Sequence, residues 1–377
     1  MYNTIAKSLN LEAWRIKGAI KRGTIKIRAD FTPPYAVFLK KMGWIEEGTV
    51  VFLGENPQVI RGYPKIKRAL FLSSAIKRHF KNNIAVEEKM NGYNVRVFSI
   101  NNKIVTLTRG GFICPYTTSR IKKIESVVKF AKKERDLVLC GEVVGTENPY
   151  VVHCYEEACN FGYFVFDVRY KGSNTPLSIK DKMEILDEYG VPRVNFFGIF
   201  PKEEVVKKTF EILREMEIKG REGVVLKDPE MKISPIKYTP SLTNISDLKY
   251  AFRFPYDFGR DFFFSRVIRE GFQAVEMEEN EEELRERARR IGESILFPMV
   301  DTIKKIKEGN AVTDDYRVRV NTEKELKELF AYLQRQGVRC TLGKKIKQNS
   351  EIIVEIKKIK SNSNDKIRFI LHEGVVE

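Results

Sequence analysis

Short runs rich in Val, Ile, Phe and Tyr fill the middle of the chain and predict a β-sheet. The predicted strands are 84–86, 93–99, 103–108, 137–139, 161–168 and 223–226. The predicted helices between them are 119–133, 178–189 and 202–218. This mixture predicts an α+β domain over residues 66–245 that is built on an antiparallel sheet.

The regions on either side of this domain show different patterns. Residues 1–65 predict a small N-terminal α+β domain. Residues 246–312 predict a helical domain that begins with an aromatic, apolar run. The expected elements of these two regions are a helix at 5–17, strands at 24–27 and 49–53, and a long charged helix at 276–307.

The last predicted domain, residues 313–377, is a small α+β unit. Thr322 and Glu325 have the spacing of a capping box at the start of its helix. Its expected elements, in chain order, are strand 316–320, helix 323–336, strands 338–342 and 352–359, a turn at 361–365 and strand 367–371.

The formal net charge of +16 at pH 7, with a pI near 9.4, indicates a polyanionic partner such as nucleic acid. Abundant Lys and Glu are also typical of heat-adapted proteins, so the charge alone leaves a general compositional bias open. No apolar run reaches the length of a membrane span. The N-terminus lacks a signal-peptide pattern, and we therefore expect a cytoplasmic protein with no membrane partner.

The chain has five cysteines, and their scattered positions give no complete metal-binding motif. His153, Cys154 and Cys159 could form part of a zinc site. Because no fourth ligand is obvious, reduced and packed thiols are the simpler prediction.

Lys89 is the first candidate for catalysis, and it lies in the run EEKMNGYNVR at residues 87–96. A lysine amine attacks a phosphate only when unprotonated, whereas the pKa of an exposed lysine is about 10.4. Burial or neighbouring cations must therefore lower that pKa. Gly92 permits a turn after Lys89, and Asn94 and Arg96 then share one face of the next strand. A lysine beside glutamates is otherwise more often a surface ion pair.

Further short runs follow Lys89 in a fixed order. They are TRGG at 108–111, LCGE at 139–142, FVFD at 164–167 and EGVVLK at 222–227, with Lys237 just beyond. This set resembles the motifs of the covalent nucleotidyltransferases, namely ATP-dependent DNA and RNA ligases and GTP-dependent mRNA capping enzymes. The resemblance covers roughly residues 84–240 and implies an antiparallel-sheet nucleotidyltransferase domain of the ATP-grasp-like ligase class.

The resemblance also implies roles for individual residues. The implied catalytic residues are the nucleophile Lys89, the metal-binding Glu222 and the phosphate-neutralising Lys237. The implied nucleotide-binding residues are Asn94 near the α-phosphate, Arg109 at the sugar or phosphate, Glu142 near the ribose, Phe166 stacked on adenine, and Lys227 at the phosphates. Glu142 and Glu222 would together hold Mg²⁺ or Mn²⁺, which prefer oxygen ligands.

Taken alone, each of these residues has a plainer interpretation. The Gly-Gly run after Arg109 could be an ordinary hairpin turn, Phe166 a core side chain, and either glutamate a solvated surface group. The sequence also departs from the family pattern at two positions. Asn91 stands where many ligases and capping enzymes have Asp, and Pro235 replaces the first lysine of a Lys-x-Lys motif.

Within the superfamily, the runs EEKxxGYNVR, TRGGF and PIKY are most similar to the archaeal ATP-dependent RNA ligase family, as is GYPKIKR at 62–68. DNA ligases and capping enzymes continue with a strand-rich OB module, whereas this chain continues with helices. The archaeal family implies a homodimer formed through the helical region. The apolar residues 262–264 and 296–297 could supply that interface, although core packing is the simpler role for any single one.

The resemblance implies an ATP-dependent RNA ligase. Such an enzyme forms lysyl-AMP, transfers AMP to an RNA 5′-phosphate and joins that end to a 3′-hydroxyl, with circles of single-stranded RNA as one product. A DNA ligase or a GTP-dependent capping-type enzyme would use the same lysine. A non-catalytic RNA-binding protein would keep the basic charge but lose the nucleophile or the carboxylates.

Overall fold

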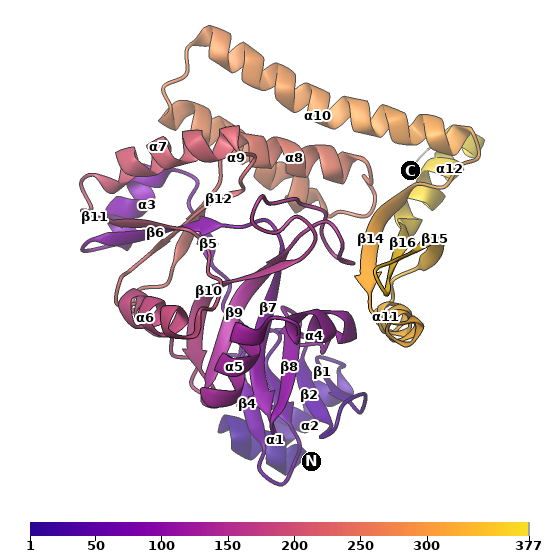
Figure 1. The fold of residues 1–377 in the computed structure, drawn as a ribbon. Helices are drawn as coiled ribbons and strands as arrows, with labels where there is room; N and C mark the ends of the chain where they lie inside the picture. The colour runs from indigo at the N-terminus through magenta and orange to yellow at the C-terminus, as the bar shows by residue number, and fades with distance from the viewer. Residues whose placement is uncertain (376–377) are drawn as a thin grey trace.

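The computed structural model describes residues 1–375, and these residues contain four β-sheets (Figure 1). Two sheets form the centre of the molecule, one lies near the N-terminus and one near the C-terminus. No helix in the described part is long and apolar enough to cross a membrane. The α+β class predicted from the sequence is confirmed, and neighbouring strands are antiparallel except for one pair, β13 and β5.

The N-terminal sheet packs against helices on one face and against a central sheet on the other. Its strands, in order, are β1 (Ile25–Arg28), β2 (Tyr35–Phe38), β3 (Val50–Phe52) and β4 (Gln58–Ile60). Ala36 and Phe38 belong to the core shared with the helices, whereas Tyr35 and Val37 face Phe98 of the central sheet, as alternation along a strand requires.

The helix predicted at 5–17 is wrong in extent, because the chain forms two helices there. These are α1 (Tyr2–Leu9) and α2 (Ala13–Lys21). Asn10 has a φ of 51°, and this left-handed conformation ends α1, as is common for Asn at a helix C-terminus.

The first central sheet has the strand order β10-β9-β7-β8. Its strands are β7 (Tyr93–Ile100), β8 (Lys103–Thr108), β9 (Leu137–Val144) and β10 (Gly162–Tyr170). The helices beside it are α4 (Pro115–Ile121), α5 (Glu125–Lys133) and α6 (Ile179–Tyr189). The single helix predicted at 119–133 is therefore two helices, whereas the strand and helix predictions at 93–99, 103–108 and 178–189 are confirmed.

The second central sheet has the order β11-β6-β12-β13-β5. Its strands are β5 (Lys67–Arg68), β6 (Ile84–Lys89), β11 (Phe196–Phe200), β12 (Gly223–Lys227) and β13 (Ile236–Tyr238). Helices α3 (Leu72–His79) and α7 (Val205–Ile218) share its buried core through Ile76 and Leu213. The short strands β5, β11 and β13 were not predicted from the sequence.

Three helices follow the second central sheet: α8 (Ser241–Phe252), α9 (Arg260–Glu276) and α10 (Glu281–Lys307). Figure 1 shows α10 as a long helix along the outer side of α8 and α9. The helix predicted at 276–307 corresponds to α10, which begins five residues later than predicted. Glu278 has a φ of 53°, and Asn280 caps α10 by exchanging hydrogen bonds with Glu283, so the chain turns between α9 and α10.

The C-terminal sheet has the order β14-β16-β15. Its strands are β14 (Thr313–Val320), β15 (Cys340–Gln348) and β16 (Glu351–Ile359), and α11 (Glu323–Arg335) packs on them. Thr322 caps α11 as predicted, but the Glu325 carboxylate accepts the N–H of Asn321 rather than that of Thr322, so the box is only half formed.

The turn at 361–365 and the strand at 367–371 are wrong predictions, because both lie in helix α12 (Ser361–Glu373). Asn364 and Ile367 are three residues apart and share the buried face of the helix. Ile367 packs with Phe254, Ile306 and Val312. Tertiary packing thus favours a helix here, although the apolar residues of this segment suggested a strand.

The prediction of reduced thiols fails for one pair, since Cys154 and Cys159 form a disulfide. The pairing also removes both sulfurs from a zinc site, and the described residues contain no group of three or more His, Cys, Asp or Glu side chains placed to hold a metal. Cys114 and Cys140 are buried free thiols, as predicted.

Candidate active site

A cavity of about 640 Å³ lies where the two central sheets meet. Its volume falls within the range usual for small-molecule sites, about 300–1,000 Å³. The residues from the predicted site that line it are Lys89, Asn94, Arg109, Glu142, Phe166, Lys227 and Lys237. The remaining predicted residue, Glu222, reaches it through an ion pair with Lys89. The fold thus brings together all eight side chains from distant segments.

Lys89 is the last residue of β6, and its position is fixed by the strand pairing and by the turn that follows. It lies opposite Gly223 of β12, next to Glu222. A Cβ atom at Gly92 would lie 2.1 Å from the carbonyl oxygen of Val143, so only glycine permits this close turn. The Asn91 N–H donates to the Tyr155 hydroxyl at 2.6 Å, and this hydrogen bond stabilises the turn.

Glu142 and Asn94 face each other across β9 and β7. Burial raises the pKa of Glu142 to about 8, the charge of Glu222 adds to the rise, and Lys89 opposes it. Asn94 Oδ1 is buried and has no hydrogen-bond partner among the described residues. An unpaired buried oxygen is costly, which suits a position that meets a ligand.

The two glutamates before Lys89 are neutralised by other partners. The Glu87 carboxylate pairs with Lys227 at 2.6 Å and also with Lys182, while Glu88 pairs with Arg221 at 3.2 Å. Nearby Lys227 and Lys182 hold the pKa of Glu87 below its usual value despite burial. Lys89 therefore does not share these carboxylates and pairs with Glu222 instead.

Phe166 occupies a bulge in β10, because the pairing with β9 shifts between Val165 and Asp167. The bulge frees the Phe166 carbonyl from the ladder, and it accepts hydrogen bonds from Lys227 at 2.6 Å and Lys182 at 3.2 Å. The Phe166 ring lines the cavity and meets the Tyr63 ring edge-on at 5.2 Å.

Lys237 belongs to a row of side chains that crosses the second central sheet. The pairing places Glu87, Val225, Lys237 and Arg68 side by side on β6, β12, β13 and β5. Burial lowers the pKa of Lys237 to about 8, and the positive charges of Arg68 and Lys89 contribute.

Arg109 and Arg96 have different surroundings. Arg109 is exposed at the cavity, at the start of a turn closed by the Gly111 N–H donating to the Thr108 carbonyl at 2.9 Å. Arg96 is buried and donates to the carbonyls of Gly48, Arg61 and Thr108. Arg96 therefore joins the N-terminal sheet to the hairpin of β7 and β8. It is not among the residues that line the cavity.

Several residues at or beside the cavity were not predicted from the sequence as site residues. They are Glu47, Tyr63, Lys65, Arg68, Glu87, Lys182 and Val194. Two signals were available: the alternation of β6 placed Glu87 on the face of Lys89, and Tyr63, Lys65 and Arg68 lie in the family-like run GYPKIKR, to which no role was given. The others depend on contacts that the sequence does not show.

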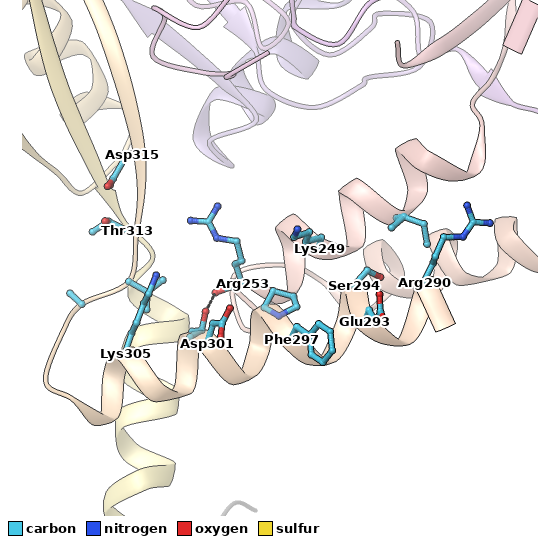
Figure 2. Close-up of a pocket in the computed structure, with 15 residues that line it drawn as sticks. Lys249, Arg253, Arg290, Glu293, Ser294, Phe297, Asp301, Lys305, Thr313 and Asp315 are labelled. Carbon is cyan, nitrogen blue, oxygen red and sulfur yellow. Dashed lines mark hydrogen bonds between the residues drawn. The ribbon is translucent and has the colours of Figure 1, made fainter. Parts of the chain in front are cut away.

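A second cavity, of about 580 Å³, lies between α8, α10 and the start of β14 (Figure 2). Figure 2 shows groups of both signs around it: Glu293, Asp301 and Lys305 come from α10, and Lys249 and Arg253 come from the facing side, at the end of α8. It contains none of the predicted site residues. Its mixed charge gives no clear ligand chemistry, and the candidate active site is therefore the cavity around Lys89.

Comparisons with known proteins agree with this choice. Residues 82–239 match the family model described as RNA ligase, and residues 250–374 match the model described as the Ligase Pab1020 C-terminal region. An uncharacterised protein of Methanocaldococcus jannaschii is 39% identical over 97% of this chain and 94% of its own length.

Solved structures resemble the whole chain. One described as an archaeal ATP-dependent RNA ligase is 41% identical, has a TM-score of 0.94 and covers 100% of this chain and 99% of its own. A proposed ATP-dependent DNA ligase from Aquifex aeolicus is 26% identical, with a TM-score of 0.89 over 97% of this chain and 100% of its own. With its motifs, its fold and its full-length similarity in agreement, the chain belongs to the archaeal ATP-dependent RNA ligase family.

Proposed function

We propose that this protein is an ATP-dependent RNA ligase that works through AMP attached to Lys89. The observation that carries the proposal is the convergence on one cavity of an amine, two carboxylates and further cations from both central sheets. Phosphate transfer needs a positioned nucleophile and compensated charge, and this site offers both.

In the first proposed step, Lys89 Nζ attacks the α-phosphorus of ATP. The bond from that phosphorus to the bridging oxygen breaks, and pyrophosphate leaves. Lys89 needs a free electron pair for the attack, and its ion-pair partner Glu222 is placed to take the proton. Phe166 stacks on the adenine, Asn94 meets the α-phosphate, Arg109 meets the sugar or phosphate, and Lys227 and Lys237 offset the charge on the phosphates.

In the second step, a terminal oxygen of an RNA 5′-phosphate attacks the same phosphorus, and the phosphoramide bond to Lys89 breaks. In the third step, an RNA 3′-hydroxyl attacks the 5′-phosphate, its proton is lost and AMP leaves. Joining two ends of one single strand gives a circle, whereas two separate strands give a longer chain. Lys237 offsets the extra negative charge in each step.

A divalent cation, Mg²⁺ or Mn²⁺, fits the carboxylates of Glu142 and Glu222. Burial raises the pKa of Glu142 although Lys89, Arg109 and Lys237 oppose the rise, and a bound cation would stabilise the ionised carboxylate. Mg²⁺ usually binds one or two carboxylates and completes its shell with phosphate and water oxygens. When bound, such an ion would withdraw charge from the phosphates.

The decisive experiment uses ATP or GTP labelled at the α-phosphate, with Mg²⁺. Denatured protein should carry covalent label from ATP in the wild type and in Lys103→Ala, an exposed lysine outside the site, but not in Lys89→Ala. Label from GTP alone would indicate a capping-type enzyme. Absence of label from both nucleotides, in folded protein free of prior AMP, would exclude the ligase mechanism and leave an RNA-binding protein.

The joining substrate is tested with the labelled enzyme. The proposal expects sealing of single-stranded RNA that has a 5′-phosphate and a 3′-hydroxyl. Equal or faster sealing of matched DNA strands would favour a DNA ligase, the activity proposed for the similar Aquifex aeolicus protein.

We also propose a homodimer formed through the helical region, and domain limits at 65, 245 and 312. Large apolar side chains are exposed on α9 and α10, among them Phe264 at 67%, Leu296 at 53% and Phe297 at 59%. Phe262 and Phe263 instead pack with Phe258 inside the chain. Exposed apolar surface of this kind favours a protein–protein contact.

A further inference from the structure

Three arginines lie beside the active-site cavity, at the edge of the second central sheet. Arg68 is on the edge strand β5, directly beside Lys237 of β13. Arg266 and Arg269, on α9, are close enough to influence the charge of Arg68 and of each other. The positive row that begins at Lys237 thus continues from the cavity onto α9.

Arg68 and Arg269 have few partners among the described residues, whereas Arg266 donates to Asp247, to the Phe262 carbonyl and to the Ser265 hydroxyl. Arg68 donates to the Thr239 hydroxyl, and Arg269 donates to Asn244 at 3.3 Å. Arg269 Nε is buried and has no hydrogen-bond partner in the described part of the chain. A guanidinium group has five N–H donors, so most donors of Arg68 and Arg269 are not used by protein groups.

The negative charge nearby is too small to balance the cluster. Asp247 pairs with Arg266 at 2.9 Å. The carboxylate of Glu270 is occupied by Ser241, Asn244 and Arg287, and that of Glu222 by Lys89. Burial together with the neighbouring arginines lowers the pKa of Arg269 to about 10, the direction expected for a cation held beside like charges. A role limited to joining α9 to the sheet would pair Arg68 and Arg269 as fully as Arg266 is paired.

We propose that Arg68 and Arg269 form a second phosphate-binding site, continuous with the active-site cavity through Lys237, and that the nearby Arg266 adds positive charge to it. Forked guanidinium groups suit phosphate oxygens better than isolated ammonium groups do. The inference rests on the proposed ligase function, which supplies two phosphate sources: the pyrophosphate end of ATP, and the strand that carries the 5′-phosphate. Both present the same anionic oxygens next to the reacting phosphorus.

The test uses Arg68→Ala, Arg269→Ala and Arg269→Gln, because Gln can keep the bond to Asn244 if the Ala variant unfolds. Arg285→Ala is the control, because Arg285 is exposed on α10 and the substitution removes the same positive charge. Two reactions are measured: formation of enzyme–AMP against ATP concentration, and sealing of RNA that already carries 5′-AMP, which needs no ATP.

If the cluster holds the pyrophosphate end, the KM for ATP rises about ten-fold or more and sealing of adenylylated RNA is unchanged. If it holds the strand, sealing weakens by a similar factor, and the slope of log affinity for RNA against log salt falls by about one. Either result supports the site. Variants that are folded and match Arg285→Ala in both reactions overturn it.

Enzyme–AMP formation by the wild-type protein distinguishes an error in the second phosphate site from an error in the ligase mechanism. If wild-type protein forms enzyme–AMP and seals RNA while the arginine variants behave like the control, only the second phosphate site is wrong. If wild-type protein forms no enzyme–AMP, the ligase mechanism itself is wrong, and binding of inorganic pyrophosphate to the wild type and to Arg269→Gln then tests the anion site directly. Equal pyrophosphate affinity in these two proteins overturns the inference.

Discussion

At the residue scale, the cavity contains a carboxyl group and an ammonium group whose pKa values have moved toward each other. Burial raises the pKa of Glu142 to about 8 and lowers the pKa of Lys237 to about 8. Both changes reflect the cost of a charge withdrawn from water. In the absence of metal, Glu142 therefore holds a proton near pH 7 and Lys237 keeps its positive charge, a state suited to an anionic nucleotide.

The raised pKa of Glu142 predicts how stability depends on pH. Its pKa rises from 4.5 to about 8 on folding, so its contribution to stability is complete below 4.5 and is lost as the pH rises to 8. Glu142→Gln cannot ionise and escapes this loss. Without metal or nucleotide, the variant should gain stability over the wild type progressively from pH 4.5 to 8, with a constant difference above 8.

Thermal unfolding midpoints in a chelating buffer at pH 5, 6.5, 8 and 9 measure this difference. Glu203→Gln serves as the control, because Glu203 is an exposed carboxylate outside the site. A difference between Glu142→Gln and wild type that stays constant from pH 5 to 8 would contradict the raised pKa.

The stacking role proposed for Phe166 predicts a loss of nucleotide affinity. Stacking of a base on an aromatic side chain is worth about 1–3 kcal/mol, so Phe166→Ala should raise the KM for ATP by roughly 5- to 150-fold in enzyme–AMP formation. Phe164→Ala is the matched control, because Phe164 lies on the same strand but does not line the cavity. Equal KM values for the two variants would reject the stacking role.

The sequence identified which residue types form the site but did not show which distant residues lie next to them. The predicted residues Lys89, Glu142 and Lys237 could be recognised because their motifs lie in short continuous runs. Arg68 and Tyr63 lie in the family-like run GYPKIKR, but no role could be given to them, because they reach the site only through the pairing of β5 with β13 and the packing of the N-terminal sheet. Arg96 was placed on the same strand face as Asn94, but its side chain binds three backbone carbonyls and does not line the cavity.

At the element scale, helix α12 shows where local sequence and tertiary packing disagree. The run IRFIL at 367–371 has the apolar density of a strand, yet no strand lies next to it for pairing. Asn364 fixes the helix instead: its side chain accepts the Val312 N–H and donates to the Val312 carbonyl, both at 2.8 Å. The strands β7 and β8, which pair with each other as a hairpin, were predicted with much better limits.

This pair of hydrogen bonds predicts a large effect for a small substitution. Asn364→Ala should lower the free energy of unfolding by about 2–4 kcal/mol, because two buried backbone groups lose their partners. Asn362→Ala is the control, since Asn362 is exposed on the same helix. Denaturant titration followed by circular dichroism measures the change, and equal midpoints for the two variants would show that α12 is held by other contacts.

At the scale of the whole molecule, the helical region forms an outer surface remote from the N-terminal sheet (Figure 1). The dimer proposed there predicts that Leu296→Glu combined with Phe297→Glu gives a monomer, because each charge would be buried in an apolar contact. Sedimentation velocity measures the mass. Ile218→Glu, which changes an apolar side chain that is 88% exposed on α7, should leave the dimer intact. A wild-type monomer would reject the proposal.

The hydrogen bonds of Arg96 bear on how far the sequence of the N-terminal sheet can change independently of the first central sheet. Its guanidinium group recognises only main-chain oxygens, those of Gly48, Arg61 and Thr108. Such a joint depends on the path of the backbone and is indifferent to which side chains the N-terminal part carries. Homologous N-terminal segments that keep the apolar face packed on Phe98 should therefore be exchangeable between relatives, because any segment with the same backbone path supplies the carbonyl acceptors at Gly48 and Arg61.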